Sequence, residues 1–263
     1  EARTFFQRAV GEGATDRPRA RLNLGILLWN QGEREDALAI FDSFIDLYNT
    51  SRARLSAEDL MAVGTAVRYL GVTDPALYQD ALMAFDDAAE IAPDDPRPDL
   101  LAGELFLEKY LATDARESLK PVLERNPRHP RALLGQARIL DFEGVGGSAD
   151  LARQALEVNP HYVEARAFLA GLFLKTEDFR RARSEALEAL ETNPVHLGAL
   201  SILAAAHFLE DDHAAYEEIR ERVQALNPTF PGLYLQVAEA AAARRQYRTA
   251  VELAGRGVEV DPS

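Results

Sequence analysis

The sequence contains no cysteine among its 263 residues. This absence excludes disulfide bonds, thiolate metal sites and cysteine nucleophiles. It does not identify a compartment, because a reducing cytoplasm and a cysteine-poor periplasm both suit such a chain. The localisation therefore stays open between cytoplasmic and periplasmic.

Basic residues are also scarce: 29 Lys and Arg stand against 43 Asp and Glu, giving a formal net charge of −14. A surface this acidic repels phosphate groups, and no cluster of Lys or Arg interrupts it. We therefore expect neither nucleic acid nor a membrane as a partner. Long hydrophobic runs are lacking too, since the longest near-apolar stretch, residues 198–209, is too short to span a bilayer.

What the chain does contain is a proline at a regular spacing through its last two-thirds. The gaps between these prolines are 34, 33, 34, 34 and 34 residues. Four of them follow an asparagine and one follows an aspartate. A period near 34 residues predicts one supersecondary unit stacked many times. The prolines are Pro93, Pro127, Pro160, Pro194, Pro228 and Pro262.

The apolar residues inside one period follow helical spacing. One stripe contains Phe168, Leu172 and Phe173, and a second contains Ala182 and Ala186. A short polar turn separates the stripes, and the proline ends the second helix because it disfavours the α conformation in the residue before it. Each unit is thus two helices joined by a turn and ended by the proline, and the sequence predicts an all-α protein.

This pattern resembles the tetratricopeptide repeat (TPR) family. The best-matching stretch contains Leu24, Gly25, Leu28, Gly32, Ala37, Phe41 and Phe44. The resemblance implies a right-handed α-solenoid of seven repeats, preceded by the second helix of a truncated repeat over residues 1–16. The chain is accordingly interpreted as a fragment of a larger bacterial protein. The predicted repeats cover residues 18–51, 57–95, 96–127, 128–162, 163–196, 197–230 and 231–263.

The family's geometry also implies a groove on the concave face, formed by one side of each first helix. Trp29 is the only tryptophan, and Trp, Tyr and Arg dominate interface hot spots. Trp29 beside Ile26, with Arg68 and Tyr69 one repeat away, is therefore the preferred docking point. The alternative is that Trp29 packs between helices. The full set of candidate groove residues is Leu22, Ile26, Trp29, Asn30, Thr65, Arg68, Tyr69, Arg97, Glu104, Gln136, Lys175, Phe208 and Glu239.

Some members of the family bind a C-terminal carboxylate through Lys and Asn at two fixed positions of one repeat. The first of these positions holds Leu22 in the first repeat and Met61 in the second. That clamp is missing here. The resemblance therefore implies a groove for an extended or helical segment of another protein, and not a receptor for chaperone tails.

The five histidines offer little chemistry. His207 and His213 enclose two aspartates, but their spacing is not the i, i+4 spacing of a helical metal site, and the repeat frame gives both a packing position. The other three, His129, His161 and His196, follow repeat-ending prolines and are interpreted as solvated turn residues. We expect no metal, no cofactor and no catalytic residue.

The leading hypothesis is a non-catalytic scaffold that binds a partner peptide or helix. The alternative is a recognition or regulatory arm of a larger enzyme, such as a hydrolase or peptidase, with the catalytic domain outside this chain. Self-association through open solenoid ends is a third hypothesis, because an end without a polar cap leaves apolar helix faces uncovered.

Overall fold

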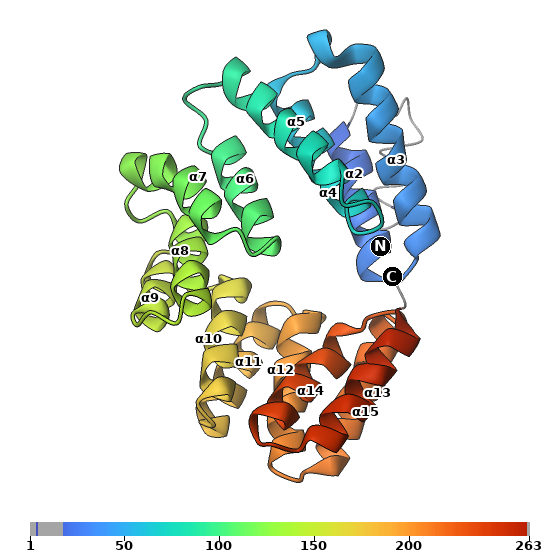
Figure 1. Cartoon of the computed structure of the whole chain (residues 1–263), viewed down its shortest axis with the longest axis vertical. Helices are drawn as coiled ribbons and strands as arrows, with labels where there is room; N and C mark the ends of the chain where they lie inside the picture. Colours follow the sequence, from blue (N-terminus) through green and yellow to red (C-terminus); the bar gives the residue numbers. More distant parts are fainter. Residues whose placement is uncertain (1–3, 5–17, 262–263) are drawn as a thin grey trace. The chain divides into compact units, whose positions relative to one another are not determined.

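The computed structural model describes Thr4 and residues 18–261, and over these residues it contains helices and no strand. The helices follow one another as hairpins (Figure 1). The predicted all-α fold of helical repeats, an α-solenoid, is confirmed. The second helix predicted over residues 1–16 falls almost entirely outside the described residues.

The chain divides into two compact units, the first ending at Val145 and the second beginning at Gly146. The division falls inside the repeat predicted over residues 128–162, and the predicted repeat boundaries stay a prediction. The first unit contains α2 (Pro18–Asn30), α3 (Arg34–Ser51), η2 (Arg52–Arg54), α4 (Ala57–Leu70), α5 (Leu77–Ile91), α6 (Arg97–Glu108), α7 (Ala112–Arg125) and α8 (Pro130–Phe142). The second contains α9 (Ser148–Val158), α10 (Val163–Lys175), α11 (Phe179–Thr192), α12 (Leu197–Leu209), α13 (His213–Leu226), α14 (Gly232–Ala243) and α15 (Tyr247–Val260).

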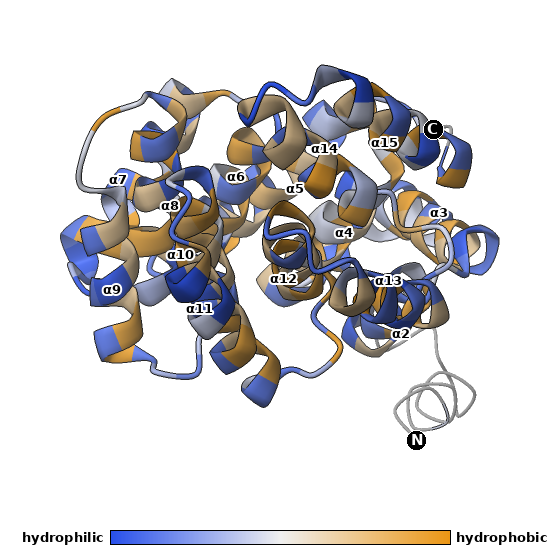
Figure 2. Cartoon of the chain, turned by 90° about the horizontal axis from the view of Figure 1, so that it is seen from below, coloured by the Kyte–Doolittle hydropathy of each residue, from blue (hydrophilic) through white to orange (hydrophobic). Residues whose placement is uncertain are grey.

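Small residues let the two helices of a hairpin approach closely. A Cβ placed on Gly25 of α2 would lie 2.6 Å from the ring of Phe41 on α3, and one on Gly103 of α6 would lie 2.9 Å from Leu119 on α7. Both large side chains are fully buried. Hydrophobic and hydrophilic residues alternate along the helices of both units, as an amphipathic repeat requires (Figure 2).

The recurring Asn-Pro pair, which follows α7, α9, α11 and α13, makes a hydrogen bond to the backbone in each case. After α11, Oδ1 of Asn193 accepts from the N–H of Val195 at 3.2 Å, and after α9 the Oδ1 of Asn159 accepts from the N–H of His161 at 3.1 Å. Such an Asx turn satisfies an N–H group that the helix leaves free, which explains why asparagine precedes the proline.

Two histidines have a different role from the one that their spacing predicted. Nδ1 of His196 accepts from the N–H of Ala199 at 3.0 Å, and Nδ1 of His129 accepts from the N–H of Ala132 at 3.4 Å. They are thus partly buried N-caps of α12 and α8, not solvated turn residues, and burial lowers the pKa of both. Of the three histidines expected in solvated turns, His161 is the one that is exposed.

Within residues 18–261 no helix combines the length and the apolar character that a membrane span requires.

Candidate protein-binding groove

The first helices of consecutive repeats form a groove of about 300 Å³ in the first unit. The sequence placed Leu22, Thr65 and Arg97 on the concave face, and the structure brings these three together here. Helices α2, α4, α6 and α8 each contribute to the wall. The lining residues are Arg19, Leu22, Glu58, Met61, Ala62, Thr65, Arg97, Leu101 and Arg131.

Apolar side chains form the floor of the groove. Leu22 and Met61 are buried and Leu101 is half-buried, so the floor is continuous with the core beneath it. Thr65 is half-buried beside Met61, and its hydroxyl donates to the Met61 carbonyl at 2.7 Å. A side chain that enters the groove therefore meets an apolar surface whose nearest hydroxyl is already satisfied.

A row of charges crosses this floor from one repeat to the next. The carboxylate of Glu58 accepts hydrogen bonds from Nη1 of Arg19 at 3.3 Å and from Nη1 of Arg97 at 3.1 Å. Arg97 also contacts Asp95, with 2.7 Å between Nη2 and Oδ2, and this pairing raises the pKa of Arg97 and lowers that of Asp95. Arg19, Glu58 and Arg97 are spaced 39 residues apart, so they occupy the same position of three successive first helices.

A second ion pair lies at the α6 and α8 side of the groove. Nε of Arg131 lies 3.0 Å and its Nη2 2.8 Å from the two carboxylate oxygens of Glu104. Glu104 is a predicted groove residue, whereas Arg131, Arg19 and Glu58 were not predicted. Arg19 and Glu58 could have been predicted, because they occupy the same repeat position as the predicted Arg97.

The predicted docking point around Trp29 is an aromatic cluster. Trp29 is half-buried, with its ring 5.3 Å from that of Tyr69 and 6.2 Å from that of Phe41, and Phe41 stacks on Tyr69 at 4.7 Å. The Arg34 guanidinium lies 3.5 Å from the centre of the Trp29 ring. Of the residues predicted at this docking point, Trp29 and Tyr69 contact each other, and the docking role of Trp29 stays a prediction.

Arg68 is held by an acid of the next repeat. Its Nε lies 2.7 Å from Oε2 of Glu108, and its Nη2 contacts Oε1 of the same carboxylate. Burial disfavours the charged form, but the hydrogen bonds to Glu108 outweigh it, so the pKa of Arg68 is raised. Arg68 thus joins α4 to α6 as a structural contact.

The other predicted residues are spread over both units. Ile26 packs partly buried against the core, Asn30 is exposed and Gln136 is half-buried on α8. In the second unit, Lys175 and Glu239 line a separate hollow of about 250 Å³, together with Leu174, Leu209 and Arg244.

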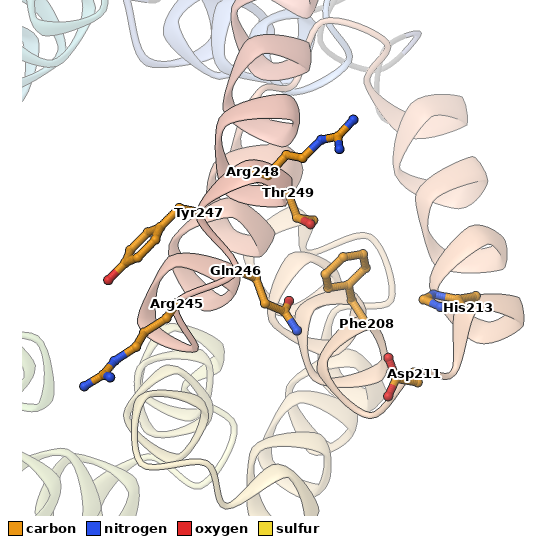
Figure 3. A pocket seen from close by; sticks show the side chains of 8 residues that line it. All are labelled: Phe208, Asp211, His213, Arg245, Gln246, Tyr247, Arg248 and Thr249. Atoms are coloured by element: carbon orange, nitrogen blue, oxygen red, sulfur yellow. The ribbon is translucent and has the colours of Figure 1, made fainter.

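Phe208 lines another hollow of the second unit, of about 550 Å³. Figure 3 shows Phe208 and Gln246 between the two sides of this hollow, while Tyr247 extends away from Asp211 and His213. The polar groups do not converge on one point, and among the described residues no three His, Asp or Glu side chains form a set that could hold a metal ion. Phe208 contacts Tyr216 edge-on, with 5.3 Å between the rings.

Comparison with known proteins finds similarity in sequence and in fold. The family profile described as tetratricopeptide repeat matches residues 1–52 and 100–144. The Protein CTR9 homolog of Arabidopsis thaliana is 26% identical over 218 residues, which make up 65% of this chain and 20% of that protein. The chain thus spans about a fifth of the length of this relative.

Two solved structures share the fold over most of the chain. A tetratricopeptide repeat protein from Parabacteroides merdae has a TM-score of 0.54 at 17% identity, covering 84% of this chain and 94% of its own. A monomeric mutant of IFIT1 solved with Gppp-AAAA has a TM-score of 0.65 at 14% identity, covering 93% of this chain and 59% of its own. At these identities the likeness shows the fold alone.

The helical hairpins and the groove across their first helices define a protein-interaction scaffold. The tetratricopeptide repeat profile matches two stretches of the chain, and the described residues have the helical-repeat fold seen in a tetratricopeptide repeat protein. Proteins of this family are typically non-catalytic and bind other proteins or peptides.

Proposed function

We propose that the groove of the first unit binds an extended segment of a partner protein. One observation carries the proposal: Arg19, Glu58 and Arg97 cross an apolar floor in register with three successive helices. An extended segment has the length to contact several repeats at once. It would place apolar side chains on Leu22 and Met61 and polar ones along the row of charges.

The ion pairs in the row of charges can exchange one partner for a charged group of the bound protein. Side chains of Arg19 and Glu58 are 69% and 46% exposed, and ion pairs this exposed stabilise a fold by only about 0–1 kcal/mol. A partner carboxylate could therefore take over a hydrogen bond from Arg19 or Arg97 at little energetic cost. The Leu22 and Met61 floor would supply the apolar contact area, and the charges would select the partner and its register.

Nucleic acid is a poorer fit to the same groove. Arg19 and Arg97 are paired with Glu58, Arg131 is paired with Glu104, and the chain carries a net charge of −14. Phosphate binding needs an excess of positive charge, because neutralised phosphates and released counterions supply most of its affinity. The IFIT1 structure was solved with Gppp-AAAA, but at 14% identity its similarity to this chain shows a shared fold and gives no indication of a shared ligand.

Site-directed photo-crosslinking tests the groove. Thr65, on the groove wall, is replaced by p-benzoyl-phenylalanine, and the exposed Thr113 of α7 receives the same replacement as a matched control. We expect discrete protein adducts from position 65, far fewer from position 113, and loss of the former when Arg97→Glu is added. Equal adducts at both positions, or adducts that nuclease removes, would contradict the proposal.

A further inference from the structure

In the second unit, α12 is covered on both sides by other first helices. It contacts α10 and α14, and these two also contact each other. The small residues Ser201 and Ala205 of α12 are almost completely buried, at 3% and 0% exposed, which lets the neighbouring helices come this close. Where α10 and α14 reach their last turns, the hollow of about 250 Å³ remains between the three helices.

The wall of this hollow is apolar and complete within the unit. Leu174 near the end of α10, Leu209 at the end of α12 and Ala240 of α14 line it, and all three are buried. Pockets that hold whole small molecules usually have volumes of about 300–1,000 Å³. At about 250 Å³ the hollow is smaller than these, so it suits one long side chain.

Two polar side chains that line the hollow have no partner. The carboxylate of Glu239 and the amide of Gln236 form no hydrogen bond or ion pair within the part of the chain that the structure describes. They lie about one helical turn apart on α14, on the same side as Ala240. The equivalent positions of α12, 34 residues earlier, hold the buried Ile202 and Ala205. In α14, two unsatisfied acceptors therefore lie beside an apolar wall.

The position of the hollow favours a positive charge. The C-terminal ends of α10, α12 and α14 meet there, and the free carbonyls of a helix end carry partial negative charge. One guanidinium of the chain is already held at this place: Nη1 of Arg244 donates to the Leu209 carbonyl at 2.6 Å, and its Nε lies 3.8 Å from Glu177. Lys175, also at the rim, is exposed and has an interaction of its own. Glu239 is thus an acid that neither of these cations neutralises.

We propose that this hollow binds one arginine side chain of a partner protein. The methylene stem lies on Leu174, Leu209 and Ala240, as the stems of long basic side chains do on apolar surfaces. The guanidinium donates to the Glu239 carboxylate and to the amide oxygen of Gln236, because its planar fork of donors matches such acceptors. The net charge of −14 attracts a basic segment from a distance. This site is separate from the groove of the first unit and does not depend on what that groove binds.

Nuclear magnetic resonance of the full ¹⁵N-labelled chain tests the proposal, with N-acetyl-arginine methylamide as the probe. We expect saturable shifts of the Gln236 side-chain amide and of the backbone N–H signals of Leu209 and Ala240. N-acetyl-citrulline methylamide has nearly the same shape without the charge, and it should bind more than about fivefold more weakly, because hydrogen bonds between charged groups are stronger. Equal binding of both probes, or no saturable shift with the arginine probe, would overturn the proposal.

Two variants test the carboxylate and the space separately. Glu239→Gln should weaken the arginine probe more than about fivefold, whereas Glu221→Gln, the same change at an exposed acid of α13, should leave binding unchanged. Ala243→Leu fills part of the hollow and keeps both acceptors, so it should also weaken binding. Ala243 is exposed, so the fold should tolerate the change, which circular dichroism checks. Binding that Glu239→Gln leaves intact, or that Glu221→Gln weakens equally, would refute the assignment.

Two further probes decide the source of the ligand and the sign of its charge. Free L-arginine should bind no more tightly than the capped probe; an affinity more than about tenfold higher would identify a free amino acid as the ligand and refute a partner protein. N-acetyl-glutamate methylamide should not bind. If it shifts the same signals, and Lys175→Gln abolishes those shifts, the hollow is an anion site and the proposal is wrong.

Discussion

The Glu58 carboxylate binds two guanidiniums from two different repeats, Arg19 at 3.3 Å and Arg97 at 3.1 Å. One acid thus joins the first helices of three successive hairpins across the mouth of the groove. Arg19 belongs to α2 and Arg97 to α6, the hairpins before and after that of Glu58. This arrangement defines the charges that a ligand would meet at the groove.

Replacing Glu58 by glutamine should separate the binding role of this acid from its stabilising role. The pairs are exposed, so we expect the free energy of unfolding to fall by less than about 1 kcal/mol. Urea denaturation followed by circular dichroism measures this change. A loss above about 2 kcal/mol would mean that the row of charges holds the fold together and is poorly suited to exchange with a ligand.

The close approach of α2 and α3 predicts a strong effect of Gly25→Ala. The added Cβ would lie 2.6 Å from a ring carbon of the fully buried Phe41, so we expect the free energy of unfolding to fall by about 1–3 kcal/mol. Gly171→Ala is the control, because its Cβ would be 3.8 Å from Ile202. That change should be neutral or stabilising by up to about 1 kcal/mol. Similar destabilisation by both would refute the packing argument.

The caps on α8 and α12 predict a dependence of stability on pH. Burial lowers the pKa of His196 and His129 below the value near 6.5 of an unfolded histidine, so the unfolded chain binds more protons between the two pKa values. Stability should therefore be full above about pH 6.5 and fall as the pH drops toward the folded pKa.

His196→Asn provides the matching variant, because asparagine is a good N-cap that does not titrate. We expect it to keep the stability of the unmodified chain near pH 8 and to reduce the loss near pH 5.5. Urea titrations at the two pH values give the comparison. An unchanged pH dependence in the double variant His129→Asn with His196→Asn would show that other groups cause it.

Substitution of Trp29 should lower the stability of the fold, and a binding experiment must separate this effect from a loss of docking. Its ring contacts Phe41 and Tyr69 and lies under Arg34, so we expect Trp29→Ala to lower the free energy of unfolding by about 2–3 kcal/mol. Trp29→Phe keeps an aromatic ring and should lower it by less than about 1.5 kcal/mol. Differential scanning calorimetry compares the two. Equal, negligible effects would mean that the ring contributes little to packing, leaving docking as its main role.

The sequence by itself determined the repeating all-α architecture, because the signals for it are local. Apolar spacing defines the helices, small residues such as Gly25 and Gly103 mark close crossings, and each Asn-Pro pair makes a hydrogen bond to the backbone two residues further on. The resemblance placed Leu22, Thr65 and Arg97 on one face, since all three hold positions on the concave side of a first helix, and the first helices of stacked repeats lie side by side.

Only the tertiary structure decided which of these faces are covered and which are free. Trp29 and Leu187 are both apolar residues on amphipathic helices, yet aromatic neighbours half-bury the first, while the second is 51% exposed. His196 likewise became a cap because its ring meets the N–H of Ala199. Burial and pairing depend on neighbours distant in the chain, and for that reason they had to be observed in three dimensions.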